Sequence, residues 1–164
     1  MKINFGRLAY CFILVFLAMI AGRYYNSFGM LNWYNEIEKP MMTPPDMVFP
    51  IVWSILYTLM AIAFYQAFMV ASTDKKRQKL NGYFLGLLFL HILWSYAFFY
   101  MGYIGTALII VIIIDIVSYM IMMMFWATST ASALLFFPYF VWILFATYLN
   151  ASFVNLNGFV IFLE

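Results

Sequence analysis

The sequence predicts an all-α integral membrane protein, a bundle of five transmembrane helices. Of its 164 residues, 68% are apolar and 9% are charged, whereas soluble domains hold about 45–50% and about 25%. The mean hydropathy is +0.98. Because one span needs about 20 mostly apolar residues, five spans occupy nearly all of residues 1–164 as one domain. No room is left for a soluble catalytic or nucleic-acid-binding domain, so we expect no nucleic-acid partner.

The first helix is expected over about residues 8–24. It follows Lys2 and Arg7, so a cleaved signal peptide is the alternative interpretation. The stretch near Ala18 lacks a good small-x-small cleavage pattern, and the apolar character continues to Arg23. An uncleaved first helix, surrounded by the lipid bilayer, is therefore favoured.

The next segment, residues 26–47, is the only long connection that we expect, and we call it loop 1. It is polar and carries aromatic residues and several prolines, among them Trp33, Tyr34, Pro40, Pro44 and Pro45. The second helix is expected over about residues 48–71. Pro50 falls in its first turn, where the missing N–H of proline costs little.

The remaining three helices are expected over about residues 80–101, 106–126 and 133–153. A dense charged cluster at residues 74–79 precedes the first of these, and we interpret it as a solvated loop beside lipid headgroups. A short turn at residues 102–105 makes the third and fourth helices antiparallel neighbours. The polar residues 128–132 lead into the fifth.

The distribution of cations predicts an orientation. Lys2, Arg7 and the four cations at 75–79 share one side, against Arg23 and Lys39 on the other. Because the side richer in Lys and Arg is normally cytoplasmic, the N-terminus is expected inside and loop 1 and the C-terminus outside. This pattern fits a bacterial plasma membrane.

Two polar residues fall within the apolar runs of the third and fourth helices, His91 and Asp115. A carboxylate at the bilayer centre costs about 2.5–3.5 kcal/mol, so Asp115 should face the bundle. Both lie about twelve residues from the turn and hence at similar depth. They form either a proton-handling or ligand-binding pair, or a structural latch in which they satisfy one another or Ser95, Ser118 and Tyr119. The structural interpretation is favoured.

The sequence gives little support for metal or nucleotide chemistry. One histidine and one aspartate make a poor zinc site, since zinc takes about four ligands, and we expect no metal. The single cysteine, Cys11, lies in an apolar run and is expected to be a buried, inert thiol. The chain also lacks a phosphate-binding glycine loop and a dinucleotide fingerprint.

Aromatic residues recur at helical spacing in the second and fifth helices. Trp53 and Tyr57 are four residues apart, so they share a face of the second helix. In the fifth, one face is expected to carry Tyr139, Trp142, Ala146 and Asn150. Two such faces can form a flat-walled pocket, in which the small Ala146 leaves room for a flat ligand or for close helix approach. Aromatic anchoring at the membrane interface is the alternative explanation.

These residues belong to longer motifs. Loop 1 and the second helix read Trp33-Tyr34-x-x-Ile37-x-Lys39-Pro40-x-x-Thr43-Pro44-Pro45 and then Pro50-x-x-Trp53-x-x-Leu56-Tyr57. The fifth helix reads Phe137-Pro138-Tyr139-x-x-Trp142-x-x-x-Ala146-Thr147-x-Leu149-Asn150, and the third contains Trp94-Ser95-x-x-Phe98-Phe99. Together they resemble the translocator protein family, TspO/MBR, also called tryptophan-rich sensory proteins or peripheral-type benzodiazepine receptors.

The resemblance implies a five-helix bundle, often a homodimer, with a pocket that opens toward loop 1. Members bind tetrapyrroles such as protoporphyrin IX, and some bind sterols or synthetic drugs. No cofactor is required, because the porphyrin enters as ligand or substrate. Some bacterial members degrade protoporphyrin in light and oxygen, with tryptophan side chains implicated, so a photo-oxidative enzyme activity is a further expectation.

Carried over by position, the resemblance assigns roles to particular residues. Trp53 and Trp142 become ring-stacking walls of the pocket and the candidate catalytic side chains. Tyr34 and Pro44 or Pro45 become part of a lid formed by loop 1. The pocket lining is expected to include Tyr57, Tyr139, Ala146 and Asn150, and the further candidate ligand-binding residues are His91, Trp94 and Asp115.

The chain departs from the family pattern at several positions. Met42 replaces a tryptophan in loop 1, and His91 replaces an asparagine in the third helix. Ala151 and Asn155 stand where a sterol-recognition stretch needs a tyrosine and a basic residue, so we predict no cholesterol binding through that segment. A small-molecule or ion transporter that uses Asp115 and His91 is the alternative function.

Overall fold

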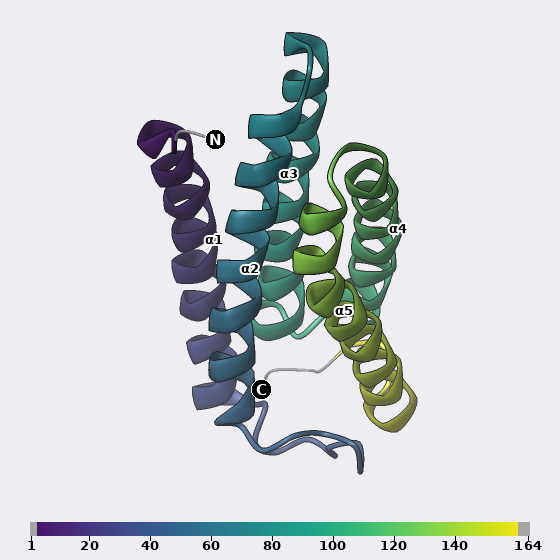
Figure 1. Cartoon of the computed structure of the whole chain (residues 1–164). Coiled ribbons are helices and arrows are strands. Elements are labelled where there is room, and N and C mark those ends of the chain that lie inside the picture. Colours follow the sequence, from purple (N-terminus) through teal and green to yellow (C-terminus); the bar gives the residue numbers. More distant parts are fainter. Residues whose placement is uncertain (1–2, 161–164) are drawn as a thin grey trace.

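The computed structural model describes residues 3–160 and confirms the all-helical fold class (Figure 1). Within this range, five helices are long and apolar enough to cross a membrane. They are α1 (Phe5–Asn32), α2 (Val48–Val70), α3 (Asp74–Ser95), α4 (Ile104–Thr128) and α5 (Thr130–Asn157), and a short π-helix, η1 (Tyr96–Tyr100), continues α3.

Helix α1 continues about two turns beyond the predicted end at residue 24. No proline interrupts the chain there, so backbone hydrogen bonding continues until the Trp33 N–H caps the carbonyl of Gly29 at 3.0 Å. Loop 1 is correspondingly shorter, residues 33–47. Helix α1 packs against α2, α3 and η1, and Cys11 is buried there as expected. It is thus an integral part of the described bundle.

The charged residues at 74–79 were predicted to form a loop, but they form the first turns of α3. The hydroxyl of Thr73 caps this helix by accepting the Lys76 N–H at 3.3 Å. Asp74 lies in the first turn, where a carboxylate is favoured by the helix dipole, and it forms an ion pair of 2.6 Å with Arg77. The charged residues of this cluster therefore project from the first turns of a helix and not from a loop.

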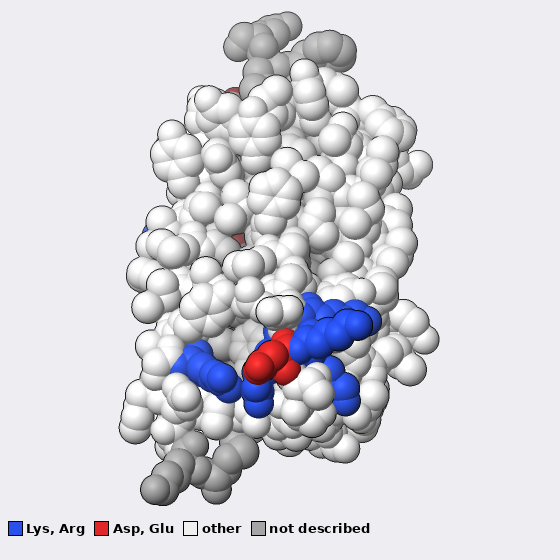
Figure 2. Space-filling model, turned by 90° about the horizontal axis from the view of Figure 1, so that it is seen from above, with Lys and Arg blue, Asp and Glu red and all other residues white. Residues whose placement is uncertain are grey.

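The two ends of the bundle differ in character. In Figure 1 the α2–α3 connection lies at the top and loop 1 at the bottom. Viewed from above, lysine and arginine side chains gather in one cluster around an acidic residue (Figure 2). Lys2, which entered the predicted orientation, lies outside the described residues. We refer to the α2–α3 end as the cation-rich end.

Aromatic rings fill the centre of the bundle toward the cation-rich end. Phe64 of α2 stacks on Phe84 of α3 with ring centroids 4.2 Å apart, and Phe125 of α4 meets Phe64 edge to face at 5.0 Å. Large apolar side chains also cover the outside of the bundle, for example Phe89 and Ile109. In a bilayer such exposed side chains meet lipid, so close packing and polar contacts between helices hold the bundle together.

Candidate ligand-binding site

Four aromatic side chains from three helices meet between α2, α3 and α5. The rings of Trp53 and Tyr57 on α2 lie 5.3 Å apart, which confirms that they share one helical face. His91 of α3 meets Trp53 edge to face at 5.3 Å and Tyr57 at 5.9 Å. Tyr139 of α5 completes the group, with its ring 5.6 Å from His91. These separations are typical of favourable aromatic pairs, and we call the four residues the aromatic cluster.

A buried hydrogen-bond chain holds the aromatic cluster in place. Nε2 of His91 lies 2.7 Å from the hydroxyl oxygen of Tyr139. That hydroxyl also lies 3.3 Å from Oγ of Ser118 on α4. Because His91, Ser118 and Tyr139 are all buried, the chain joins α3, α4 and α5 at one level.

His91 and Asp115, for which a mutual hydrogen bond was one of the expected arrangements, have different partners in the structure. Among the described residues neither a hydrogen bond nor an ion pair joins them; Asp115 instead accepts a 2.8 Å hydrogen bond from the hydroxyl of Thr147 on α5. Equal depth placed the two groups at one level, but their directions differ, since His91 faces α2 and α5. Within residues 3–160, the second carboxylate oxygen of Asp115 is buried without a hydrogen-bond partner.

The predicted face of α5 divides into two parts. Tyr139 and Asn150 are buried in the bundle, whereas Trp142 and Ala146 are half-buried. Asn150 accepts a hydrogen bond from Trp94 Nε1 at 3.0 Å and donates to the Ile104 carbonyl at 2.8 Å. The structure thus brings Trp94 and Asn150 together, as an internal bridge between α3, α5 and the start of α4.

Trp142 lies against the beginning of α2. Its ring centroid is 6.2 Å from that of Phe49 on α2 and 5.4 Å from that of Phe145. In the described part of the chain, its indole Nε1 is buried without a hydrogen-bond partner. A buried donor without an acceptor normally costs about 1–3 kcal/mol. Trp142 therefore offers an unused N–H group to an incoming acceptor.

Loop 1 covers the end of the bundle opposite the cation-rich end (Figure 1). Tyr34 is buried, with its ring 5.6 Å from Phe99 and 5.7 Å from Phe153. Lys39 Nζ lies 4.7 Å from the Tyr34 ring centroid, a cation–π contact. Burial, together with the nearby Asp46 carboxylate, raises the pKa of Tyr34 to about 12. Tyr34 thus anchors the loop by packing beneath it.

The two candidate lid prolines lie just before α2. Pro44 is half-buried and Pro45 is exposed. The carbonyl of Pro45 accepts the Val48 N–H at 2.8 Å and so fixes the entry into α2. Their structural contribution is to turn loop 1 into α2.

Sequence reasoning missed two contacts that fix loop 1. The indole N–H of Trp33 donates to the Phe99 carbonyl at 2.9 Å, within η1, where the π-helical pattern changes backbone pairing. Asn157 of α5 donates to the Glu38 carbonyl at 2.9 Å and accepts the Glu38 N–H at 3.0 Å. Trp33 and Phe99 stood within the quoted motifs, whereas no sequence signal joins Glu38 to Asn157.

The fold and this arrangement define an integral membrane protein with five candidate spans and an aromatic interior beside a fixed loop. The chain belongs to the TspO/MBR family, whose pattern matches residues 11–156. It is 35% identical over 147 residues to the tryptophan-rich protein TspO of Archaeoglobus fulgidus, covering 89% of this chain and 94% of that protein.

Two further relatives extend this similarity. The tryptophan-rich sensory protein of Cereibacter sphaeroides is 37% identical over 126 residues, which cover 77% of each chain. The human translocator protein is 30% identical over 122 residues, covering 73% of this chain and 72% of the human protein.

Proposed function

We propose that this protein is a membrane receptor for tetrapyrroles such as protoporphyrin IX and for related hydrophobic ligands. The ligand lies between α2 and α5, with Trp53 and Trp142 as its aromatic walls and loop 1 as its lid. The ligand is held non-covalently, and no further cofactor takes part in binding.

The observation that carries this proposal is the buried indole N–H of Trp142, which has no hydrogen-bond partner among the described residues. The Trp142 ring contacts Phe49 across the α2–α5 boundary. A tetrapyrrole offers both a flat aromatic face for stacking and polar groups that accept a hydrogen bond. Binding would satisfy the indole donor and replace ring contacts within the protein by ring contacts with the ligand.

The aromatic cluster, which contains the proposed wall residue Trp53, is closely packed, so a ligand that enters beside it must displace some of these rings. Rings of the aromatic cluster already lie 5.3–5.9 Å apart. Loop 1 is tied to α5 through Asn157 and to η1 through Trp33, and these contacts must yield or move with the loop as the ligand enters. The half-buried Ala146 leaves the least side-chain volume on this face of α5.

Titration of the purified protein with protoporphyrin IX in the dark tests the proposal. The Soret absorbance of the porphyrin and the quenching of tryptophan emission report binding. Trp142→Phe removes the indole N–H and part of the wall, so we expect roughly two- to tenfold weaker binding. Trp53→Phe is expected to weaken binding in the same direction. Trp126→Phe is the matched control, because Trp126 is 47% exposed on α4.

The pocket assignment fails if Trp53→Phe and Trp142→Phe both bind the porphyrin as tightly as the unaltered protein. It also fails if Trp126→Phe weakens binding as much as either of them. Circular dichroism of each variant establishes that the helices are retained, so that a loss of binding reports on the site.

We further propose that light and oxygen lead to degradation of the bound porphyrin. The supporting observation is that two oxidisable indoles, Trp53 and Trp142, are half-buried at the proposed walls. Illumination of the aerobic complex should bleach the Soret band faster than illumination of free porphyrin in the same detergent. An unchanged spectrum of the complex after illumination removes this activity and leaves the binding proposal standing.

We propose that the protein lies in a bacterial plasma membrane with its cation-rich end on the cytoplasmic side. We also propose that it forms a homodimer. The cations of α3 support this orientation, since Lys and Arg are retained on the cytoplasmic side. A cysteine introduced at exposed Met41 in loop 1 should react with a membrane-impermeant maleimide in intact cells. Labelling at Gln78 on α3 instead would reverse the orientation. Sedimentation in detergent measures the oligomeric state.

The transport alternative relies on Asp115 and His91 acting together. In the structure these residues belong to separate hydrogen-bond pairs, Asp115 with Thr147 and His91 with Tyr139. This arrangement favours a role in helix packing for each, and we therefore place the receptor function first.

A further inference from the structure

After α5 the chain turns back over the start of α4. The last backbone hydrogen bond of α5 joins the Gly158 N–H to the Val154 carbonyl at 2.9 Å. Gly158 then takes a positive φ of 84°, a conformation that glycine adopts readily. The carbonyl of the next residue, Phe159, accepts the Gly105 N–H at 2.9 Å. We call Gly158–Val160 the return segment.

The return segment caps the start of α4. The first N–H groups of a helix have no partner within it, and in the described part of the chain no side chain caps α4. The Phe159 carbonyl takes this role at Gly105. The Phe159 ring also lies on Gly105, because a Cβ atom at position 105 would overlap the ring and lie 2.6 Å from its Cγ atom. The absence of a side chain at Gly105 thus provides the seat for this ring.

The same end of α5 holds loop 1. Asn157, directly before the return segment, donates to the Glu38 carbonyl at 2.9 Å and accepts the Glu38 N–H at 3.0 Å. One turn earlier, the Phe153 ring lies 5.7 Å from that of Tyr34. Because only Gly158 separates Asn157 from Phe159, the seating of Phe159 on α4 fixes where Asn157 stands. Loop 1 and the start of α4 are therefore joined through one short piece of chain.

The contacts of this short piece lie at the surface. Phe159 is 64% exposed and Glu38 is exposed, whereas Trp33 and Tyr34 at the start of loop 1 are buried. Segments with few buried contacts open locally at a low cost in free energy. The return segment and the Glu38 hydrogen bonds are therefore the contacts that should open first when loop 1 moves.

We propose that the return segment is a latch for loop 1. While Phe159 is seated on Gly105, Asn157 holds loop 1 closed, and release of Phe159 lets loop 1 open. The latch sets how fast a ligand enters, as gating loops do in other proteins. This role rests on the proposed function, in which loop 1 is the lid of the ligand site.

Hydrogen exchange of the purified full chain, without ligand, tests the latch. Phe159→Ala removes the ring that is seated on Gly105, and Gly105→Ala displaces the same ring by filling its seat. We expect about fivefold faster exchange across residues 33–47 in both variants. Phe137→Ala is the matched control, since Phe137 is a 51% exposed phenylalanine on α5, and less than twofold change is expected.

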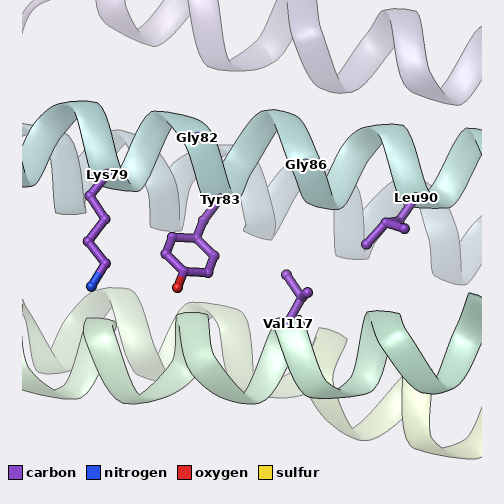
Figure 3. A pocket seen from close by; sticks show the side chains of 6 residues that line it. All are labelled: Lys79, Gly82, Tyr83, Gly86, Leu90 and Val117. Atoms are coloured by element: carbon purple, nitrogen blue, oxygen red, sulfur yellow. The ribbon is translucent and has the colours of Figure 1, made fainter.

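A second control separates release of the latch from a general loosening of α4. In Figure 3, Val117 points from α4 toward α3. It is twelve residues from Gly105, or about 18 Å at a rise of 1.5 Å per residue. Val117→Ala weakens the packing of α4 far from the return segment, so exchange across loop 1 should stay within twofold of that in the unaltered protein.

A reversible crosslink tests the latch in the opposite direction. Because a Cβ atom at position 105 would lie 2.6 Å from Cγ of Phe159, cysteines at both positions can reach the Cβ separation of about 3.5–4.5 Å that a disulfide requires. The oxidised variant that combines Gly105→Cys with Phe159→Cys cannot release the latch. Its loop 1 should exchange about fivefold more slowly than after reduction, whereas each single cysteine variant should be insensitive to the reductant.

The association rate of protoporphyrin IX separates the latch from the proposed function. It should rise in Phe159→Ala and fall in the oxidised double-cysteine variant. Unchanged exchange across loop 1 in Phe159→Ala and Gly105→Ala would overturn the latch, and so would equal exchange before and after reduction of the crosslink. Altered exchange with an unaltered association rate would overturn its control of ligand entry. If the unaltered protein binds no porphyrin while exchange responds as expected, the latch stands and the proposed function fails.

Discussion

Nε2 of His91 lies 2.7 Å from the hydroxyl oxygen of Tyr139, and this contact joins α3 to α5 in the middle of the bundle. Both side chains are buried. Tyr139→Phe would leave the imidazole and Ser118 without this partner, so we expect a loss of about 1 kcal/mol in unfolding free energy. Denaturation in mild detergent, followed by circular dichroism, measures it.

Tyr119→Phe is the control for this prediction. Tyr119 is 56% exposed on α4, so removal of its hydroxyl should change stability by less than about 0.5 kcal/mol. An equal loss in both variants would show that the buried contact between His91 and Tyr139 adds nothing to stability.

Hydropathy could predict the number of helices because each span must match the apolar thickness of a bilayer. It could not predict their full length. Residues 25–32 and 74–79 are helical in the structure but polar or charged in part, so an apolar-run criterion stops short of them. The start of α3 is decided by the Thr73 cap, and the end of α1 is extended because no proline interrupts it. Hydropathy does not report either factor.

The candidate site could be predicted only within single helices. Spacing of four residues correctly placed Trp53 beside Tyr57. Contacts between helices depend also on how each helix is rotated about its axis, which depth along the chain does not give. The sequence therefore left the partner of His91 open and did not suggest Tyr139, and the hydrogen bonds between Glu38 and Asn157 carry no sequence signal at all.

The hydrogen bond between Asp115 and Thr147 predicts that the Thr147 hydroxyl contributes more to the stability of the bundle than a negative charge on Asp115 does. Thr147→Val removes the hydroxyl that donates at 2.8 Å, so it should cost about 0.6 kcal/mol, the average for such bonds in membrane bundles. Asp115→Asn keeps an acceptor oxygen and removes a charge that is costly in the bilayer, so stability should be unchanged or higher. Thermal unfolding in detergent distinguishes the two variants. A larger loss from Asp115→Asn than from Thr147→Val would point to a role for the ionised carboxylate.

The close approach of α1 to η1 at Gly29 makes this glycine irreplaceable. A Cβ there would lie 2.8 Å from the Phe99 ring and 2.9 Å from the Phe99 carbonyl oxygen. Because the backbone of η1 cannot move away without disturbing the Trp33 hydrogen bond, Gly29→Ala should cost about 1–3 kcal/mol. Gly6→Ala is the control, since its Cβ would make an ordinary contact at 3.6 Å. Equal stability of both variants in a denaturant titration would contradict the close packing of α1 on η1.

The two hydrogen bonds between Asn157 and the backbone of Glu38 predict how loop 1 is held. Asn157→Ala removes both, and we expect faster hydrogen exchange and proteolysis across residues 33–47 with little change in global stability. Asn155→Ala, an exposed neighbour on α5, should leave loop 1 protected. If Asn157→Ala also leaves the hydrogen exchange of loop 1 unchanged, loop 1 is held by Trp33 and Tyr34 instead.

The buried phenol of Tyr34 predicts a change in alkaline solution. Burial and the Asp46 carboxylate raise its pKa to about 12, whereas tyrosine in an unfolded chain titrates near about 10. The folded state thus holds this proton more tightly. The stability that the protonated phenol contributes is complete below about pH 10 and is lost as the pH rises through the folded-state value of about 12.

The measurement is the absorbance of phenolate at high pH, taken as the difference between the unaltered protein and Tyr34→Phe. The phenolate of Tyr34 should appear near pH 12. Asp46→Asn should lower that midpoint, and a Tyr34 midpoint near about 10 in the intact protein would show that loop 1 does not bury this ring.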